Sequence, residues 1–303
     1  MKALIIKEAF KHFCTFHPYL SLEHSIEYFS ILGGIEEKSN FGFFDDLFSM
    51  VQSNFVENFQ RFESLLSPSY LTETPYKEIL TAIARGDGKL YSVLKKARLS
   101  ESTGEKLIEA LVSLGILFVE PTREQPLRTH PKQKLKKELR SYRIQDKLRF
   151  SQPFMRFWFG FVMPYREDLL VGEGVSFMDY FEKHYERLYS LVYEQLCNAL
   201  LAHYCFSKGK KPLLSHGSYW DQHSEFDLLA ITAEKKLILG ECKYKERKIC
   251  KNEFSKLKAK AKKSGIVVDI YVLFSKNGFS KELLQMKDER LWLFDVTDLK
   301  QLL

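Results

Sequence analysis

Two short apolar segments separated by a polar turn, between residues 224 and 244, constrain the fold of this chain more than any other stretch. The first segment reads SEFDLLAIT and the second reads KLILGECKY. This pattern is typical of a β-hairpin that is buried on at least one face. Because side chains alternate along a strand, we expect Glu241 and Lys243 to share a face, and the hairpin can bring Asp227 beside them. The sequence therefore predicts that two carboxylates and a lysine converge.

This cluster has a metal-binding interpretation and a simpler alternative. A buried pair of carboxylates is unfavourable because of repulsion and desolvation, and a hard divalent cation such as Mg²⁺ relieves both. Alternatively, Glu241 and Lys243 form an ion pair on the surface of a strand, which contributes little to stability when it is exposed. That alternative does not account for Asp227 opposite them in an apolar strand. We therefore favour a metal site.

The same residues resemble a known motif. Asp227, followed after thirteen residues by Glu241, Cys242 and Lys243, resembles the D…ExK core of the PD-(D/E)XK nuclease superfamily. The segments SYWDQHSEFDLLA, LILGECKY and YVLFSKNGFSKEL are similar to the C-terminal domain of archaeal-type AAA ATPases whose tail is nuclease-like. The resemblance covers nearly the whole chain after about residue 25 and is most specific between residues 220 and 280.

The resemblance implies hydrolysis of phosphodiester bonds with Mg²⁺ or Mn²⁺ held by Asp227, Glu241 and the carbonyl group of Cys242. Lys243 is then expected to orient or activate the attacking water and to stabilise the developing charge. In this superfamily an acidic residue of the first helix often joins the site, and YEQLCNALL places Glu194 there, with an ordinary surface glutamate as an equal alternative. Cations just past the second strand are expected to grip the phosphate backbone of a nucleic acid, namely Lys245, Arg247, Lys248 and Lys251.

Residues 175–303 are predicted to form an α/β/α domain with the element order of the restriction-endonuclease-like fold. After a helix around 180–201 come three strands, a lysine-rich helix at 252–264 and the strand IVVDIYVLFS. The strand of Glu241 is connected to the strand IVVDIYVLFS through that helix. Such a crossover connection predicts that the two strands pair in parallel. The near-continuous apolar runs predict a sheet that is covered on both faces.

Three regions precede this domain, so the predicted class is a multidomain α+β protein. Apolar residues at three- and four-residue spacing predict a helical region over 1–70, including a helix that begins at FDDLF. Residues 71–149 follow the order of a winged helix-turn-helix, with two helices, a longer third helix and the strand ILFVEP. Residues 150–174 form an aromatic helical linker whose rings we expect in the core rather than stacked on bases.

The third helix of 71–149 is a weak candidate for reading DNA. We expect either Ser100 or Ser102 to cap its N-terminus. Its face offers one base, Lys106, among three acids, Glu101, Glu105 and Glu109. Because base and phosphate contacts need Lys, Arg or amide groups, a protein contact is favoured over major-groove binding. The polar connector that follows, over 121–149, is either the wing hairpin or an extended arm laid against nucleic acid.

The net charge of +7 is unevenly distributed. Residues 241–263 hold ten basic and three acidic side chains, and residues 128–149 hold nine basic and two acidic ones. Residues 1–66 hold five basic and nine acidic side chains. Such asymmetry is typical of a protein that meets a polyanion, although a solvated face is the alternative for either run alone. DNA is therefore the predicted partner.

Other protein classes are disfavoured by features that the sequence lacks. No GxxxxGK[ST] occurs, so no ATP site is predicted. No run of eighteen apolar residues and no signal peptide occurs, so we expect a cytoplasmic protein without a membrane partner. The five cysteines lack CxxC spacing, which indicates free thiols rather than zinc or disulfides.

Two functions remain open. The first is a magnesium- or manganese-dependent deoxyribonuclease, for which the resemblance leaves a homodimer open. The second is a non-enzymatic DNA- or protein-binding component that works with a separate ATPase.

Overall fold

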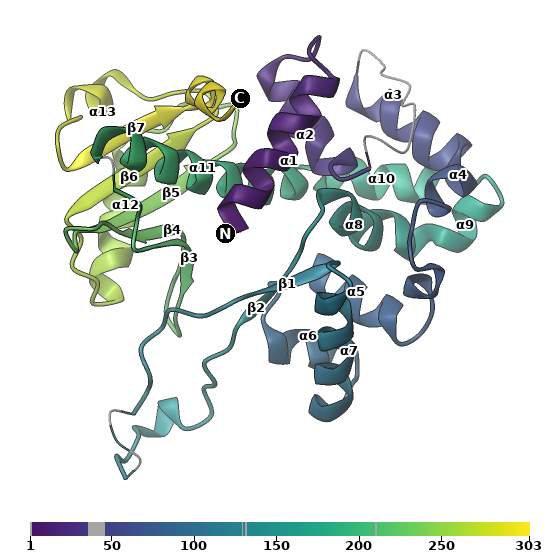
Figure 1. The fold of residues 1–303 in the computed structure, drawn as a ribbon, viewed down its shortest axis with the longest axis horizontal. Helices are drawn as coiled ribbons and strands as arrows, with labels where there is room; N and C mark the ends of the chain where they lie inside the picture. Colours follow the sequence, from purple (N-terminus) through teal and green to yellow (C-terminus); the bar gives the residue numbers. More distant parts are fainter. Residues whose placement is uncertain (1, 36–45, 129, 131, 210) are drawn as a thin grey trace. The chain divides into compact units, whose positions relative to one another are not determined.

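The computed structural model describes residues 2–35, 46–128, 130, 132–209 and 211–303. The chain divides into two compact units, each assembled from segments that are distant in sequence (Figure 1). We call them the sheet unit, Met1–Ile26, Thr122–Ile144 and Tyr189–Leu303, and the helical unit, Glu27–Pro121 and Gln145–Leu188. The mixed α+β class is confirmed. In the predicted helical region, residues 36–45, and with them the start of the helix expected from FDDLF, lie outside the described residues.

The sheet unit is built on five strands in the order β3-β4-β5-β6-β7. These strands are β3 (Ser215–Trp220), β4 (Glu225–Ile231), β5 (Leu237–Lys243), β6 (Ile270–Ser275) and β7 (Leu291–Asp295). The β3–β4 and β4–β5 pairs are antiparallel, whereas the β5–β6 and β6–β7 pairs are parallel. The predicted hairpin is therefore confirmed, and so is the parallel step through helix α12 (Lys251–Lys263).

Strand β6 is shorter than the apolar stretch from which it was predicted. Its ladder with β5 begins at Ile270, and Val267 is 85% exposed. The preceding Asp269 meets the first residue of β5, because its carboxylate Oδ2 accepts a hydrogen bond from the Leu237 N–H at 2.7 Å. Residues 266–268 form no strand, and Ile266 and Val268 pack against the core instead.

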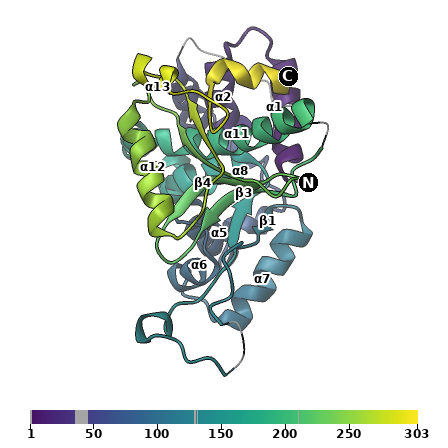
Figure 2. The same ribbon diagram turned by 90° about the vertical axis from the view of Figure 1, so that its left-hand side faces the viewer.

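Helices cover both faces of this sheet. Helix α12 packs on one face through Leu257, in a cluster that contains Leu291 and Leu293 of β7. Helix α11 (Glu186–Gly209) packs on the other face, where the Tyr204 ring meets the Phe294 ring at 4.9 Å between centroids. Because successive side chains of β7 point to opposite faces, α11 and α12 lie on opposite sides of the sheet (Figure 2). This arrangement confirms the predicted double cover.

The remaining elements of the sheet unit are short, apart from an N-terminal helix. They are α1 (Lys2–Phe16), the beginning of α2 (Leu22–Leu32), the 3-10 turn η3 (Lys137–Leu139), α13 (Lys281–Gln285) and the 3-10 segment η6 (Val296–Leu302). Residues 122–144, which the sequence placed with the winged helix, group with this unit.

The helical unit contains the elements predicted for residues 71–121. They are α5 (Tyr76–Ala84), α6 (Leu90–Lys96), α7 (Glu101–Ser113) and β1 (Leu117–Glu120), which pairs antiparallel with β2 (Lys147–Phe150). Ser100 caps α7 by accepting a hydrogen bond from the Thr103 N–H at 3.1 Å. Lys106 and the three acids of α7 are exposed.

The aromatic segment forms the core of the helical unit, as expected. Phe154, Phe157, Trp158 and Phe159 are at most 1% exposed. They lie on α8 (Pro153–Phe157) and on a π-helical turn, η4 (Trp158–Val162). The other elements are α3 (Leu47–Val51), η1 (Gln52–Glu57), α4 (Phe59–Glu63), η2 (Ser69–Thr72), η5 (Met163–Tyr165), α9 (Arg166–Leu170) and α10 (Val175–His184). Among the described helices of both units, none is long and apolar enough to cross a bilayer.

Candidate functional site

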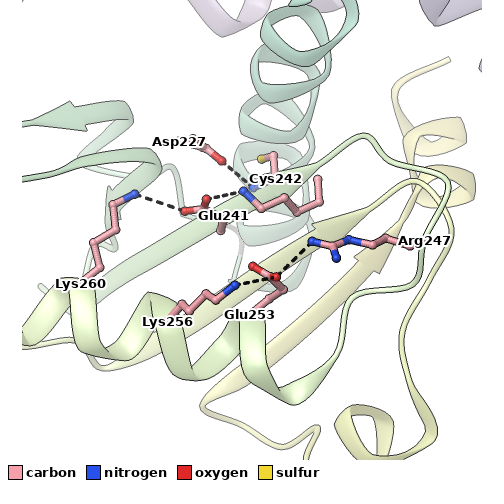
Figure 3. Close-up of polar contacts among 8 residues, drawn as sticks. Asp227, Glu241, Cys242, Arg247, Glu253, Lys256 and Lys260 are labelled. Atoms are coloured by element: carbon pink, nitrogen blue, oxygen red, sulfur yellow. Dashed lines mark hydrogen bonds and ion pairs between the residues drawn. The ribbon is translucent and has the colours of Figure 1, made fainter. Parts of the chain in front are cut away.

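The two carboxylates predicted from the sequence lie on neighbouring strands in the sheet unit. The registered ladder of β4 and β5 ends at the pair Leu228 and Gly240, and Asp227 and Glu241 are the next residues on each strand. Asp227 is held by the backbone of β5, because its Oδ2 accepts a hydrogen bond from the Cys242 N–H at 2.8 Å (Figure 3). The predicted convergence of the two acids is therefore present in the fold.

Glycine at position 240 permits this close pairing of three strands. A Cβ atom added there would lie 2.7 Å from Val272 Cγ1 and 3.3 Å from Leu228 Cβ. These neighbours belong to β6 and β4, so no larger side chain fits without displacing the ladder. Gly240 therefore allows β5, the strand that carries Glu241, to pack closely between β4 and β6.

Two lysines approach the Glu241 carboxylate, one at each oxygen. Lys243 Nζ lies 2.6 Å from Oε1, and Lys260 Nζ of α12 lies 3.6 Å from Oε2. Lys260 also lies over the Phe226 ring, 4.7 Å from its centroid. Because the Glu241 side chain is 19% exposed, these ion pairs are partly desolvated and are stronger than a surface pair.

Burial raises the pKa of the Asp227 carboxyl group, and the nearby charge of Glu241 raises it further, to about 6. The hydrogen bond from Cys242 and the charges of Lys243 and Lys260 oppose this shift only in part. Burial lowers the pKa of Lys243, but its ion pair with Glu241 more than compensates, so the net shift is upward. At neutral pH Lys243 is therefore positively charged, whereas Asp227 is ionised less readily than an exposed aspartate.

Glu194 lies on α11, near the same strand. Burial raises the pKa of the Cys242 thiol most, and smaller contributions come from Cys197, Asp227 and Glu194. Both acids are therefore close enough to Cys242 to act on its thiol. Among the residues that the structure describes, no group of three or more His, Cys, Asp or Glu side chains is arranged to hold a metal ion.

A divalent cation fits this site through a smaller set of donors. Asp227 and Glu241 supply carboxylate oxygens, and the Cys242 carbonyl is the third donor that the motif implies. Mg²⁺ is commonly bound by one or two carboxylates and keeps several waters, so three side-chain ligands are not required. Burial and the charge of Glu241 raise the pKa of Asp227, and a cation between the two carboxylates would oppose both effects. Lys243 and Lys260 would have to move away from the oxygens that the cation takes.

Three of the four cations predicted to grip phosphate gather beside Lys243. A small pocket is lined by Lys243, Lys245, Arg247, Lys248, Ile249 and Glu253. Arg247 is paired with Glu253 at 3.3 Å, whereas the side chains of Lys245 and Lys248 make no ion pair with any residue that the structure describes. The fourth, Lys251, does not line this pocket and is paired with Glu282 at 2.9 Å.

Lys260 was not predicted as a site residue. The sequence marks the helix around it as lysine-rich, but its register relative to the sheet decides which lysine faces Glu241. That register follows from Phe254, Leu257 and Ala261, which pack in the core below the sheet. Their spacing in the sequence marks the buried face of α12, but Lys256, Lys258 and Lys262 flank that face as Lys260 does, so it does not single out Lys260.

Comparison with known proteins places part of this chain in a family context. The model of the DUF234 family, described as archaea bacterial proteins of unknown function, matches residues 158–260. The match includes Glu194, Asp227, Glu241 and Lys243 and ends within α12. No curated protein and no solved structure matches the chain significantly.

Proposed function

We propose that this protein is a metal-dependent nuclease that hydrolyses phosphodiester bonds in DNA at Asp227, Glu241 and Lys243. The observation that carries the proposal is the pair of partly buried carboxylates on neighbouring strands with a lysine 2.6 Å from one of them. Burial and the charge of Glu241 disfavour the ionised form of Asp227, and Lys243 and Lys260 offset this only in part. A hard cation held by both carboxylates would offset the remainder.

Each residue has a distinct role in the proposed reaction. The cation, when bound to Asp227, Glu241 and the Cys242 carbonyl, lowers the pKa of a water and offsets charge on the scissile phosphate. Lys243 acts as a cation, because its raised pKa keeps the ammonium group protonated at neutral pH. It therefore donates hydrogen bonds to the attacking water or to a phosphate oxygen, and the proton released by the water passes to bulk solvent.

The cationic pocket beside Lys243 suits the backbone of the substrate. Lys245 and Lys248 are without an ion-pair partner in the described part of the chain, so a phosphate can bind them without breaking an existing pair. Arg247 would exchange Glu253 for phosphate. These contacts position the backbone and carry no sequence preference by themselves.

A second candidate function is binding of DNA without cleavage, in a complex with a separate ATPase. The ion pairs of both Glu241 oxygens with Lys243 and Lys260 favour it, because a cation must displace them before catalysis. In this alternative the lysines remain in place and the site is a stable ion-pair cluster.

A cleavage assay separates the two functions. Labelled duplex, single-stranded and branched DNA are incubated with the protein in Mg²⁺, in Mn²⁺ and in EDTA. The nuclease proposal requires cleavage in a divalent cation that falls by at least about a hundredfold in Asp227→Ala, Glu241→Ala and Lys243→Gln. Glu234→Gln serves as the control, because it changes an exposed carboxylate that is paired with Lys211 in the turn between β4 and β5.

Two outcomes would contradict the nuclease. One is cleavage that persists unchanged in all three site variants, which would indicate a different active site or a contaminant. The other is retarded migration of DNA with no cleavage in either cation, which would support the binding function instead.

A further inference from the structure

A basic arm is anchored to the β3–β4 hairpin, in which β4 carries Asp227. We use this name for residues 122–144, which form an extended loop of the sheet unit (Figure 1, lower left). The Arg123 guanidinium donates hydrogen bonds to the carbonyl groups of Leu229 at 2.8 Å, of Gly217 and of Ser218. These carbonyls belong to β4 and to the edge strand β3 at its irregular register, so the base of the arm is fixed to this hairpin.

The two ends of the arm are also joined to each other. The Tyr142 hydroxyl donates a hydrogen bond to Glu124 Oε2 at 2.7 Å. Burial raises the pKa of Tyr142, and Glu124, Asp221 and Tyr219 raise it further, so the tyrosine lies near the turn between β3 and β4. The arm is therefore a closed loop that leaves and returns at the same end of the hairpin.

The segment between these anchors carries exposed cations that have no partner of opposite charge. The cationic residues that form no ion pair with any described residue are Arg128, Lys132, Lys134, Lys136, Lys137 and Arg140, and all are exposed. Arg140 donates only to the backbone carbonyl of Leu135, at 3.2 Å. Sequence asymmetry alone leaves a solvated face open, but the Arg123 bonds fix the base of the loop that carries these charges on β3 and β4.

The spacing of two of these lysines matches a regular polyanion. Lys134 and Lys136 alternate along a stretch with no helix, strand or turn, just after the turn that the bond from the Gln133 N–H to the His130 carbonyl closes. Alternate residues of an extended chain are about 6–7 Å apart, which is comparable to the separation of successive phosphates along a nucleic acid strand. The leucines at 127, 135 and 139 are half-buried, so the arm offers no exposed apolar face to a lipid bilayer.

We propose that the basic arm binds the phosphate backbone of duplex DNA and holds it against the β3–β4 hairpin. The arm supplies a second contact, separate from the pocket of Lys245 and Lys248, and both contacts belong to the sheet unit. Binding through the arm requires no hydrolysis. DNA binding by the arm can therefore be tested independently of the nuclease activity proposed above. If both are present, the arm holds the substrate for that activity.

Salt-dependent binding of the full chain to DNA tests this proposal. The affinity for a fluorescent duplex of about 20 base pairs is measured in EDTA at about 50 to 200 mM salt. The arm variant combines Lys132→Gln, Lys134→Gln, Lys136→Gln and Lys137→Gln. Each lost phosphate contact reduces the slope of log K against log salt by about 0.9, so we expect a reduction of about 3 to 4 and an affinity at least about a hundredfold lower.

A matched control removes the same charge elsewhere in the sheet unit. It combines substitutions to Gln of four exposed lysines outside the arm and the pocket, Lys235, Lys236, Lys287 and Lys300. We expect its slope to stay within about one contact of the wild type. A second arm variant, Arg128→Gln with Arg140→Gln, should reduce the slope by about 2 and confirms the effect if the first variant folds poorly.

The outcomes separate the proposal from its rivals. Equal slopes for both arm variants and the control would overturn it, since the binding would then follow net charge alone. Unchanged DNA binding by the arm variants, together with lost binding to phosphatidylserine vesicles or to an acidic peptide, would also overturn it. The wild type should bind the duplex in EDTA, where metal-dependent cleavage cannot occur, whether or not it cleaves DNA in Mg²⁺, which keeps the two proposals distinguishable.

Discussion

Replacing Asp227 by Asn should stabilise the metal-free protein at neutral pH. Burial and the charge of Glu241 raise the pKa of Asp227 from 3.8 to about 6, so the folded protein disfavours the charged carboxylate that the unfolded chain tolerates. Asparagine has nearly the same shape, carries no charge and keeps an oxygen that can accept the hydrogen bond from the Cys242 N–H. The substitution therefore removes the electrostatic penalty and retains the contact.

The shift in pKa sets the magnitude. A difference of about two pKa units corresponds to about 3 kcal/mol, and we expect about 2 to 3 kcal/mol of added stability at pH 7. The sign depends on pH in a defined way. Because the pKa of a carboxyl group is raised in the folded state, the wild type loses stability as the pH rises from about 4 to about 6. The advantage of Asp227→Asn should thus be full above about pH 6 and absent below about pH 4.

Urea unfolding between pH 4 and pH 8, in EDTA, measures this effect. Hydrogen exchange of peptides from β4 and β5 reports on the sheet unit itself. Asp179→Asn is the control, because Asp179 is an exposed carboxylate of α10, and its change should stay within about 0.5 kcal/mol at every pH. A variant at position 227 that is less stable than the wild type at pH 7, or a stabilisation that does not vary with pH, would refute the reasoning.

Three further predictions follow from the same contacts. Gly240→Ala should destabilise the protein by about 1 to 3 kcal/mol in urea unfolding, because its Cβ would press on β4 and β6, whereas Gly209→Ala, with open space around it, should change stability by less than about 0.5 kcal/mol. Lys260→Gln should raise the pKa of Asp227 further in an NMR titration and tighten Mn²⁺ binding by up to about tenfold, and an unchanged pKa would contradict the geometry. Arg123→Ala should speed hydrogen exchange at Leu229 and its neighbours by about tenfold or more, and unchanged exchange would show that the arm is not anchored there.

Local sequence patterns predicted the part of the fold that carries the carboxylates. The alternation of side chains along a strand predicted which residues of β4 and β5 share a face. The helix between β5 and the next apolar segment predicted that the two strands pair in parallel. Asp227 and Glu241 could therefore be placed on neighbouring strands from their positions alone. The prediction overran at the start of β6, where the ladder begins at Ile270. It also took residues 180–201 as a single helix, which the structure divides at Tyr185 into the end of α10 and the first part of α11.

Contacts between distant residues could not be predicted in this way. Arg123 bonds to the carbonyl of Leu229, 106 residues away, and no local periodicity encodes such a pair. For this reason residues 122–144 were assigned to the neighbouring helices rather than to the sheet unit. The approach of Lys260 to Glu241 depends on how α12 is rotated by its buried residues, which the count of lysines does not reveal.

Calorimetric titration with Mn²⁺ and Mg²⁺, in the presence of a noncleavable DNA duplex, tests the central claim that Asp227 and Glu241 form a cation site. Wild-type protein is compared with the double variant Asp227→Asn, Glu241→Gln, which keeps the shape of both side chains and removes both charges. We expect the wild type to bind the cation and the double variant to lose that binding. Equal binding by both proteins, or none by either, would contradict a metal site formed by these two carboxylates.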